Sequence, residues 1–228
     1  MKEIIEPRKI SKTKVKYHKS TFDNTSEDRQ QKVLGVAISE FAANGYNATN
    51  INIIAKKAGI SIGSMYSYFE SKEALFLTAV DKGYHLLERA LKEIDIENGD
   101  IFEIFERLLR ASRHYAINFP ELNQIYLDVT TQGLSSLSSK LSKQMESITA
   151  ELYCDVIKRA KQKGIISPEA DEQLVSFCLD NLIIMFQFSF TSDYYKERMK
   201  IFLGPEAMND EERIIQGVIS FVKKALAK

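Results

Sequence analysis

Apolar residues recur at three- and four-residue spacing along most of the chain, which is the period of an amphipathic helix. The first clear stripe consists of Val33, Leu34, Ala37, Ile38 and Phe41. Helical patterns follow one another from there to the C-terminus, and no segment reads convincingly as a strand. The pattern therefore predicts an all-α protein.

Boundary signals predict four helices in the first part of the chain. Thr25 and Asp28 have the spacing of a capping box, which predicts the start of the first helix, and Asn44-Gly45 predicts its end. The second predicted helix is short and extends from Asn50 to Gly59, and the third extends from Ser61 to about Phe69. A longer fourth helix is capped by Ser71.

The remaining sequence predicts five more helices, at about 100–118, 121–130, 134–163, 168–191 and 209–227. Pro120 ends the first of them. Ser167, Pro168 and Glu169 form a strong start signal, because a capping hydroxyl is followed by proline at the first helical position and then by an acid.

Charge is balanced overall but unevenly distributed. Lys+Arg and Asp+Glu number 31 each, yet residues 1–73 carry a net charge of +4 and residues 74–228 carry −4. A mildly basic N-terminal third permits DNA binding without demonstrating it. Residues 1–24 lack apolar periodicity, which predicts a flexible arm. This arm is either a solubilising tail or a segment that follows the phosphate backbone of DNA or enters its minor groove. Its basic residues are Lys2, Arg8, Lys9, Lys12, Lys14, Lys16 and Lys19.

The most hydrophobic run extends from Leu174 to Phe190 but contains Asp180, Asn181 and Gln187. It is slightly short for a bilayer span and polar at its middle, so a buried helix is favoured over a membrane anchor. No signal peptide is recognisable, and we expect a cytoplasmic protein without membrane contact.

Catalytic and metal-binding patterns are not found. His18, His85 and His114 have no zinc-site spacing, and no phosphate-binding loop or nucleophile elbow occurs. Cys154 and Cys178 are expected to be free buried thiols rather than a disulfide. We therefore expect neither an enzyme nor a cofactor.

The stretch from Asn44 to Leu75 carries the chemistry. Its two short helices are joined by Ala58-Gly59-Ile60-Ser61, a tight turn typical of a helix-turn-helix. In that motif the second helix enters the major groove of DNA. Here this helix has a small, hydroxylated face with two tyrosines, whose hydroxyls can donate to phosphates.

This stretch resembles the TetR family of bacterial repressors over about residues 26–76. The resemblance is carried by Phe41-Ala42-Ala43-Asn44-Gly45-Tyr46 with Thr49, and by Ile54-Ala55, Ala58-Gly59-Ile60-Ser61, Gly63, Met65-Tyr66, Tyr68-Phe69, Lys72-Glu73 and Leu75. It implies a three-helix DNA-binding domain at 25–72 and a larger helical bundle at 73–228 that binds an effector and forms a homodimer.

The resemblance also implies which residues meet DNA. Thr49 and Asn50 fall where the family touches phosphate, and Asn52 falls where a base-reading arginine occurs; an asparagine there can pair with adenine instead. Ile62 departs from the usual basic residue and could contact a thymine methyl group. The remaining predicted DNA contacts are Ser61, Gly63, Ser64, Tyr66, Ser67, Tyr68 and Lys72.

Each of these assignments has a structural alternative. Met65 and Phe69 are better interpreted as core of the three-helix unit, together with Ala55 and Ile60. Tyr66 could pack through its ring while its hydroxyl reaches DNA. Lys72 could be a solvated lysine at a helix start.

The resemblance assigns dimerisation to the last two long helices. The run from Leu174 is apolar nearly all round, as expected of a helix that faces its own core and a partner. The abundance of aromatic residues in the second half suggests an apolar or amphipathic effector, although such residues are more often simply core. The candidate pocket residues are Phe105, His114, Tyr115, Tyr126, Tyr153 and Phe186.

The sequence therefore predicts a repressor that a small, apolar effector releases from a palindromic operator in double-stranded DNA. The alternative is a helical carrier of small molecules, or a scaffold protein, whose helix-turn-helix is purely structural.

Overall fold

Helices account for the regular structure in the part of the chain that is described. The computed structural model describes residues 16–131 and 135–228, without the side chains of 131–140 and 143–145. Within these residues the single β-type pairing is an isolated bridge between Ile166 and Ala227. The predicted all-α fold is confirmed.

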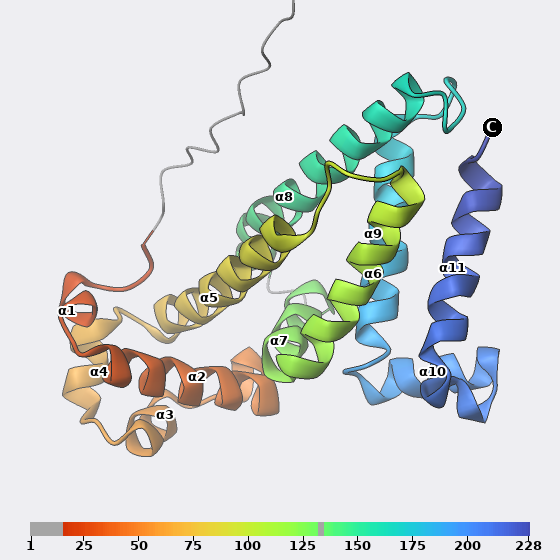
Figure 1. Cartoon of the computed structure of the whole chain (residues 1–228). Helices are drawn as coiled ribbons and strands as arrows, with labels where there is room; N and C mark the ends of the chain where they lie inside the picture. Colours follow the sequence, from red (N-terminus) through yellow and green to blue (C-terminus); the bar gives the residue numbers. More distant parts are fainter. Residues whose placement is uncertain (1–15, 132–134) are drawn as a thin grey trace, which may run out of the picture.

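The N-terminal helices gather at one end of the molecule, and a long helix leads from them into the rest (Figure 1). The group comprises α1 (Ser20–Asp23), α2 (Glu27–Ala48), α3 (Ile51–Ala58) and α4 (Ile62–Tyr68), and the long helix is α5 (Lys72–Glu93).

Three predicted helix starts and one predicted stop are confirmed. The side chains of Asn50, Ser61 and Ser71 accept hydrogen bonds from the backbone N–H groups of the first turns of α3, α4 and α5. Gly59 ends α3 with a φ of 73°, in the left-handed region that glycine enters without steric cost. These caps explain how two helices of eight and seven residues are held at a tight turn.

The capping box predicted at Thr25 is wrong. The N-cap of α2 is Ser26, and the Thr25 hydroxyl instead donates to the carbonyl of Phe22 at 2.9 Å. The predicted break at Gly45 is present as a local kink, because this residue has φ 69° and ψ 166° within the span of α2.

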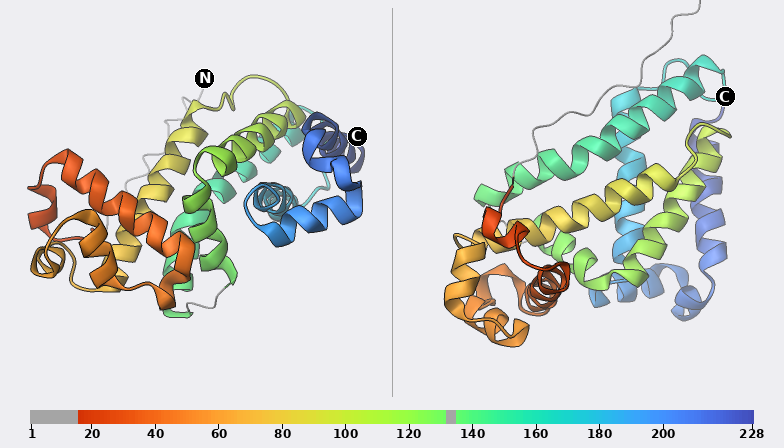
Figure 2. Two further views of the ribbon diagram at one scale, coloured as in Figure 1. Left: turned by 90° about the horizontal axis from the view of Figure 1, so that it is seen from below. Right: turned by 60° about the vertical axis from the view of Figure 1, so that its left-hand side comes forward.

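The second part of the chain packs upright helices beside one another (Figures 1 and 2). Helix α9 packs against α6 and α8, and α11 packs against α6. The elements are α6 (Ile101–Asn118), α7 (Pro120–Thr131), α8 (Ser135–Gln162), α9 (Glu172–Phe188), α10 (Asp193–Leu203), the 3-10 helix η1 (Pro205–Asn209) and α11 (Glu211–Leu226).

Two sequence predictions fail in this part. The signal at Ser167-Pro168 does not start a helix: these residues lie in a turn, and Asp171 caps α9 instead, so that α9 begins at Glu172. Helix α10 was not predicted, because its apolar residues form no continuous buried stripe and Met199 is its buried residue.

Two hydrophobic cores stabilise the chain, and α5 helps to join them. The first core unites α2, α3 and α4 with the first half of α5 and with Leu122, Ile125 and Val129 of α7. The second lies among α6, α8, α9 and α11 and reaches Leu91 of α5. A domain boundary at residue 72 therefore falls at the start of a helix that belongs to both units.

Two further expectations concern the second part. In the described ranges no single helix is long and apolar enough to cross a membrane, and α9 with α10 meets that test only as a pair bent by 106°. Cys154 and Cys178 are free thiols, but Cys154 is only half-buried and Cys178 is exposed, so the expectation of two buried thiols is wrong.

Candidate DNA-binding surface and effector cavity

Helix α4 turns one side into the first core and the other to solvent. Met65 is fully buried on the inner side, followed by Phe69 just beyond the helix end. On the outer side Tyr66 is 47% exposed, and its hydroxyl makes no hydrogen bond with a described residue. The helix is therefore anchored by apolar packing while a polar face stays free.

The segment before α2 fixes the C-terminal end of α4. The last carbonyls of a helix have no partner within it. Here the Lys19 backbone N–H donates to the Tyr68 carbonyl at 2.8 Å, the Lys19 Nζ donates to the Tyr66 carbonyl at 3.0 Å, and the Thr21 hydroxyl donates to the Ser67 carbonyl. These three hydrogen bonds satisfy the last three carbonyls of α4, which have no donor within the helix.

An aromatic contact fastens this segment to the core. Phe22 of α1 is 2% exposed, and its ring centroid lies 5.3 Å from that of Tyr68 and 4.8 Å from that of Phe69. The expectation of a loosely attached arm is therefore wrong for residues 16–24, while residues 1–15 lie outside the described part. A lone buried phenylalanine in a polar stretch gives no periodic signal.

Lys72 links the start of α5 to the C-terminal end of α2. Its Nζ donates to the carbonyls of Tyr46, Asn47 and Thr49 at 2.8, 3.1 and 3.1 Å, and lies 4.7 Å from the centre of the Tyr46 ring. A cation at the C-terminal end of α2 is favoured by the helix dipole. The three donors of this ammonium are thus already used within the protein, so Lys72 is not a solvated lysine, and a phosphate contact by it stays a prediction.

Most of the predicted DNA contacts form one accessible surface around α4 and the start of α3. Ser64 is half-buried within it. A side chain added at Gly63 would lie 3.8 Å from the nearest described atom, the Ser61 Oγ, so the fold itself does not require glycine there. The exposed members are Asn50, Asn52, Ser61, Ile62, Gly63, Tyr66 and Ser67.

Two predicted contacts are placed otherwise. The Thr49 side chain is buried and its hydroxyl donates to the carbonyls of Glu40 and Gly45 at 3.1 and 2.7 Å. Tyr68 is also buried and packs on Phe22. Both side chains therefore stabilise the fold, and a contact of either residue with DNA stays a prediction.

Two lysines beside this surface were missed by sequence reasoning. The Lys32 Nζ, from α2, lies 3.4 Å from where a side chain on Gly59 would begin, which places it at the turn between α3 and α4. Lys56 is exposed near the end of α3. Both lie on helices, where the apolar periodicity shows which face is buried but not which exposed residues bind a partner. Either ammonium is placed where it could contact a DNA phosphate.

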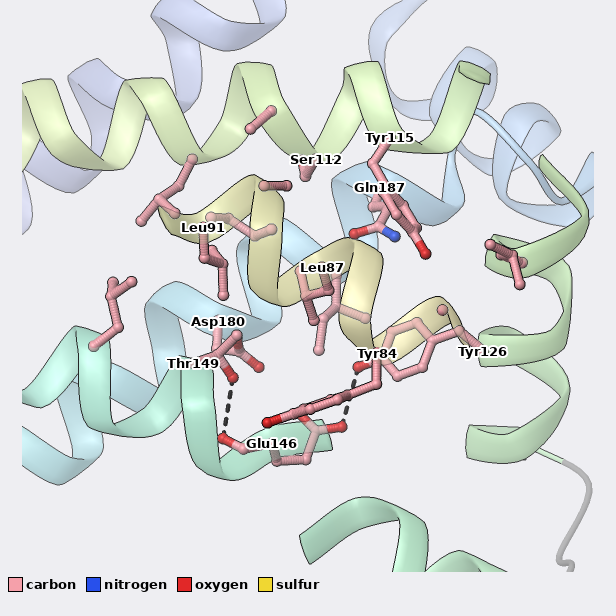
Figure 3. A pocket seen from close by; sticks show the side chains of 18 of the residues that line it. Tyr84, Leu87, Leu91, Ser112, Tyr115, Tyr126, Glu146, Thr149, Asp180 and Gln187 are labelled. Atoms are coloured by element: carbon pink, nitrogen blue, oxygen red, sulfur yellow. Dashed lines mark hydrogen bonds between the residues drawn. The ribbon is translucent and has the colours of Figure 1, made fainter. Parts of the chain in front are cut away.

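A separate cavity of about 100 Å³ lies in the second part of the chain, among α5, α6, α7, α8 and α9 (Figure 3). Its wall is mostly aliphatic, with residues such as Leu87, Leu108, Ile125 and Ile183. Its polar groups are Tyr84, Ser112, Tyr115, Tyr126, Glu146, Thr149, Tyr153, Asp180 and Gln187.

Three of the six predicted pocket residues line this cavity, namely Tyr115, Tyr126 and Tyr153. The other three do not. Phe105 and Phe186 are buried in the second core, and His114 is exposed beside Asn118, whose Nδ2 lies 3.2 Å from its Nδ1. Aromatic composition alone could not separate cavity residues from core.

Two acids in the cavity wall were not predicted as pocket residues. Tyr126 donates its hydroxyl to Glu146 at 3.1 Å, and burial raises the pKa of Glu146 above its usual value. Burial, reinforced by the charge of Glu146, raises the pKa of Asp180 to about 6. Burial also raises the pKa of Tyr115 to about 12. Glu146 and Asp180 are both half-buried.

Two short helices at a tight turn, with the second offering an exposed polar face, define a DNA-binding protein of the helix-turn-helix class. No three described His, Cys, Asp or Glu side chains are arranged to hold a metal ion. Residues 33–79 match the family model described as bacterial regulatory proteins, tetR family.

Curated relatives agree with this match. The chain is 24% identical over 156 residues to the uncharacterised regulator YdgC of Bacillus subtilis (strain 168), covering 68% of this chain and 77% of that protein. It is 29% identical over 139 residues to the regulator QacR of Staphylococcus aureus (strain Mu50), covering 59% and 72%.

Solved structures share the fold over nearly the whole chain. A TetR family regulator from Chloroflexus aurantiacus J-10-FL superposes with a TM-score of 0.70 at 21% identity, covering 92% of this chain and 99% of that one. The ketosteroid regulator KstR2 of Mycobacterium tuberculosis gives 0.63 at 22% identity, covering 90% and 97%.

Residues 33–79 therefore match the DNA-binding domain of the tetR family of bacterial regulatory proteins, and the chain is a DNA-binding transcriptional regulator. Regulators of this family bind DNA, dimerise and bind small-molecule effectors.

Proposed function

We propose that this protein is a dimeric repressor that leaves a palindromic operator when a small molecule occupies the cavity among α5 to α9. One observation carries the proposal: a single helix, α5, connects the unit that presents α4 to the wall of the cavity. Its first residue, Lys72, fastens the end of α2, while Gly83, Tyr84 and Leu87 line the cavity.

The coupling has a second route through α7. This helix packs against α2 and also contributes Leu122, Ile125 and Tyr126 to the cavity wall. A ligand that prefers a different position of α5 and α7 would shift the α4 helices of a dimer relative to each other. The factor by which the ligand weakens DNA binding cannot exceed the ratio of its affinities for the two states, and DNA weakens ligand binding by the same factor.

Selection of bound duplexes from a random pool tests this proposal. A dimer with two copies of α4 in successive major grooves should enrich an inverted repeat with half-site centres roughly 34–36 Å apart. A pool that shows no enriched sequence at moderate salt would contradict it and favour the carrier or scaffold alternative.

We propose α4 and the start of α3 as the reading surface. Tyr66→Phe is expected to weaken binding to every duplex about fivefold, because one hydrogen bond to a phosphate is lost, worth about 1 kcal/mol. Fluorescence anisotropy on the selected duplex and a scrambled one measures this. Tyr68→Phe is the matched control, since the Tyr68 ring is buried and should give a smaller effect. Unchanged binding by Tyr66→Phe would remove Tyr66 from the surface.

We propose that α9 and α11, which run antiparallel at one side of the molecule (Figure 1), form the dimer interface. Helix α9 buries Leu179 and Ile183 but leaves Leu174 and Phe177 exposed, and α11 exposes Phe221. Large apolar side chains on an outer face are typical of surfaces that a partner covers.

Phe177→Glu is expected to convert the dimer into a monomer, because the side chain is 67% exposed in one protomer and would place a charge in the interface. Sedimentation velocity at micromolar concentration measures the change. Ile117→Glu on α6 is the matched control and should remain dimeric. A dimeric Phe177→Glu variant, or a monomeric wild-type protein, would contradict this interface.

A further inference from the structure

The mostly apolar wall of the cavity among α5 to α9 contains acidic side chains without basic ones among the described residues. Among the described residues that line it there are two carboxylates, Glu146 and Asp180, and no lysine, arginine or histidine. Asp180 makes no hydrogen bond or ion pair with any described residue, and the one side-chain partner of Glu146 is a neutral phenol, Tyr126. An uncompensated acid in an apolar wall is costly for the free protein.

A second, independent observation is that several tyrosine hydroxyls of the cavity wall have no hydrogen bond to a described residue. Tyr153 is 4% exposed and lines the cavity, yet its hydroxyl forms no hydrogen bond within the described structure. A hydroxyl in a cavity wall without a protein partner is able to donate to a ligand that enters the cavity. Tyr84 and Tyr115 also line the cavity without a hydrogen bond to a described residue.

The acids and the rings lie together. In Figure 3, Glu146 and Asp180 approach one part of the hollow beside the rings of Tyr84 and Tyr126, while Leu87 and Leu91 lie along another part of the wall. Aromatic faces attract cations through the ring quadrupole, most strongly where water is excluded. Two carboxylates behind such rings add a direct Coulomb attraction.

We propose that the cavity binds a lipophilic cation, an ammonium-type head with an apolar body, whose positive group lies between Glu146 and Asp180. The apolar body would occupy the aliphatic part of the wall. This inference deepens the proposed function by naming the chemistry of the effector. It narrows the apolar or amphipathic effector expected from composition to one that carries a positive charge. A cation placed beside the two unpaired acids removes a desolvation cost that an uncharged ligand would leave in place.

The test uses three probes with the same eight-carbon chain and different charge: octyltrimethylammonium, octanol and octanoate. Isothermal titration calorimetry with the full chain should show the cation binding at least tenfold more tightly than octanol and octanoate more weakly still. Equal or tighter binding of octanol or octanoate, or no binding of the cation, would overturn the proposal.

Variants locate the cation. Asp180→Asn combined with Glu146→Gln should lower the affinity for octyltrimethylammonium at least tenfold and leave that for octanol the same or higher. Glu151→Gln, which removes an exposed carboxylate from α8, should change neither. A double variant that keeps the preference for the cation would place the charge recognition elsewhere and refute the proposed site.

The same protein preparation should be titrated with the selected duplex. Sequence-selective DNA binding without cation binding would reject the cation alone and leave the proposed regulator intact. Absence of both would reject the regulator as well.

Discussion

Phe22→Ala is expected to lower the free energy of unfolding by about 3–5 kcal/mol, the usual cost of truncating a buried phenylalanine. The ring is almost fully buried against Tyr68 and Phe69. Its loss would also release the segment that donates to the last three carbonyls of α4. We therefore expect DNA affinity to fall together with stability. Urea unfolding and anisotropy on the selected duplex measure the two effects.

Tyr66→Ala is the matched control, because it removes an exposed aromatic side chain from the same unit. It should leave stability within about 1 kcal/mol of the wild type while weakening DNA binding. A Phe22→Ala protein as stable as the wild type would show that α1 does not brace the recognition helix.

Asp180→Asn is expected to stabilise the protein without ligand by about 1–3 kcal/mol at pH 7.5 and to change little at pH 4. The pKa of Asp180 is about 6 in the folded chain, against about 3.9 in an unfolded one. Between these values the folded state binds the extra proton, so this contribution to stability is full below about pH 4 and is lost as the pH rises through 6.

The measurement is the difference in unfolding free energy between variant and wild type from pH 4 to pH 8. Taking the difference cancels the titration of groups that both proteins share. Glu151→Gln should give a nearly flat difference, because that carboxylate is exposed. A flat difference for Asp180→Asn would show that Asp180 is ionised in the folded chain as easily as in the unfolded one.

The two variants are expected to change stability in opposite directions, because Phe22→Ala lowers the free energy of unfolding and Asp180→Asn raises it. Phe22 supports the presentation of α4, so its loss harms both. Asp180 is costly in the free protein and is retained, in our proposal, because it receives a cation. Residues that reduce stability at a binding site are common where function requires them.

The helix-turn-helix could be predicted closely from sequence because its signals are local. Asn50, Gly59 and Ser61 act through their own backbone neighbours, so each cap can be identified from a few adjacent residues. Lys72 illustrates the limit: its motif position is correct, but its partners lie 23 to 26 residues away at the end of α2. No pattern in the neighbouring residues predicts the contact between Lys72 and the end of α2.

The cavity was predictable only in part. Tyr115, Tyr126 and Tyr153 were named from composition, but Phe105 and Phe186 were equally aromatic and lie in the core. Asp180 did carry a signal, since it is an acid within a long apolar run. That signal disfavours a membrane span but does not by itself locate a site. Glu146 stands in an ordinary polar stretch and required the fold.

The central claim is that the exposed face of α4 recognises a particular DNA sequence. The most direct test is the affinity of the wild-type dimer for the selected duplex and for a scrambled duplex of equal length, at about 150 mM salt. The account predicts that the selected duplex binds at least 10³-fold more tightly, within the usual range for specific regulators. Equal affinities for the two duplexes would contradict it.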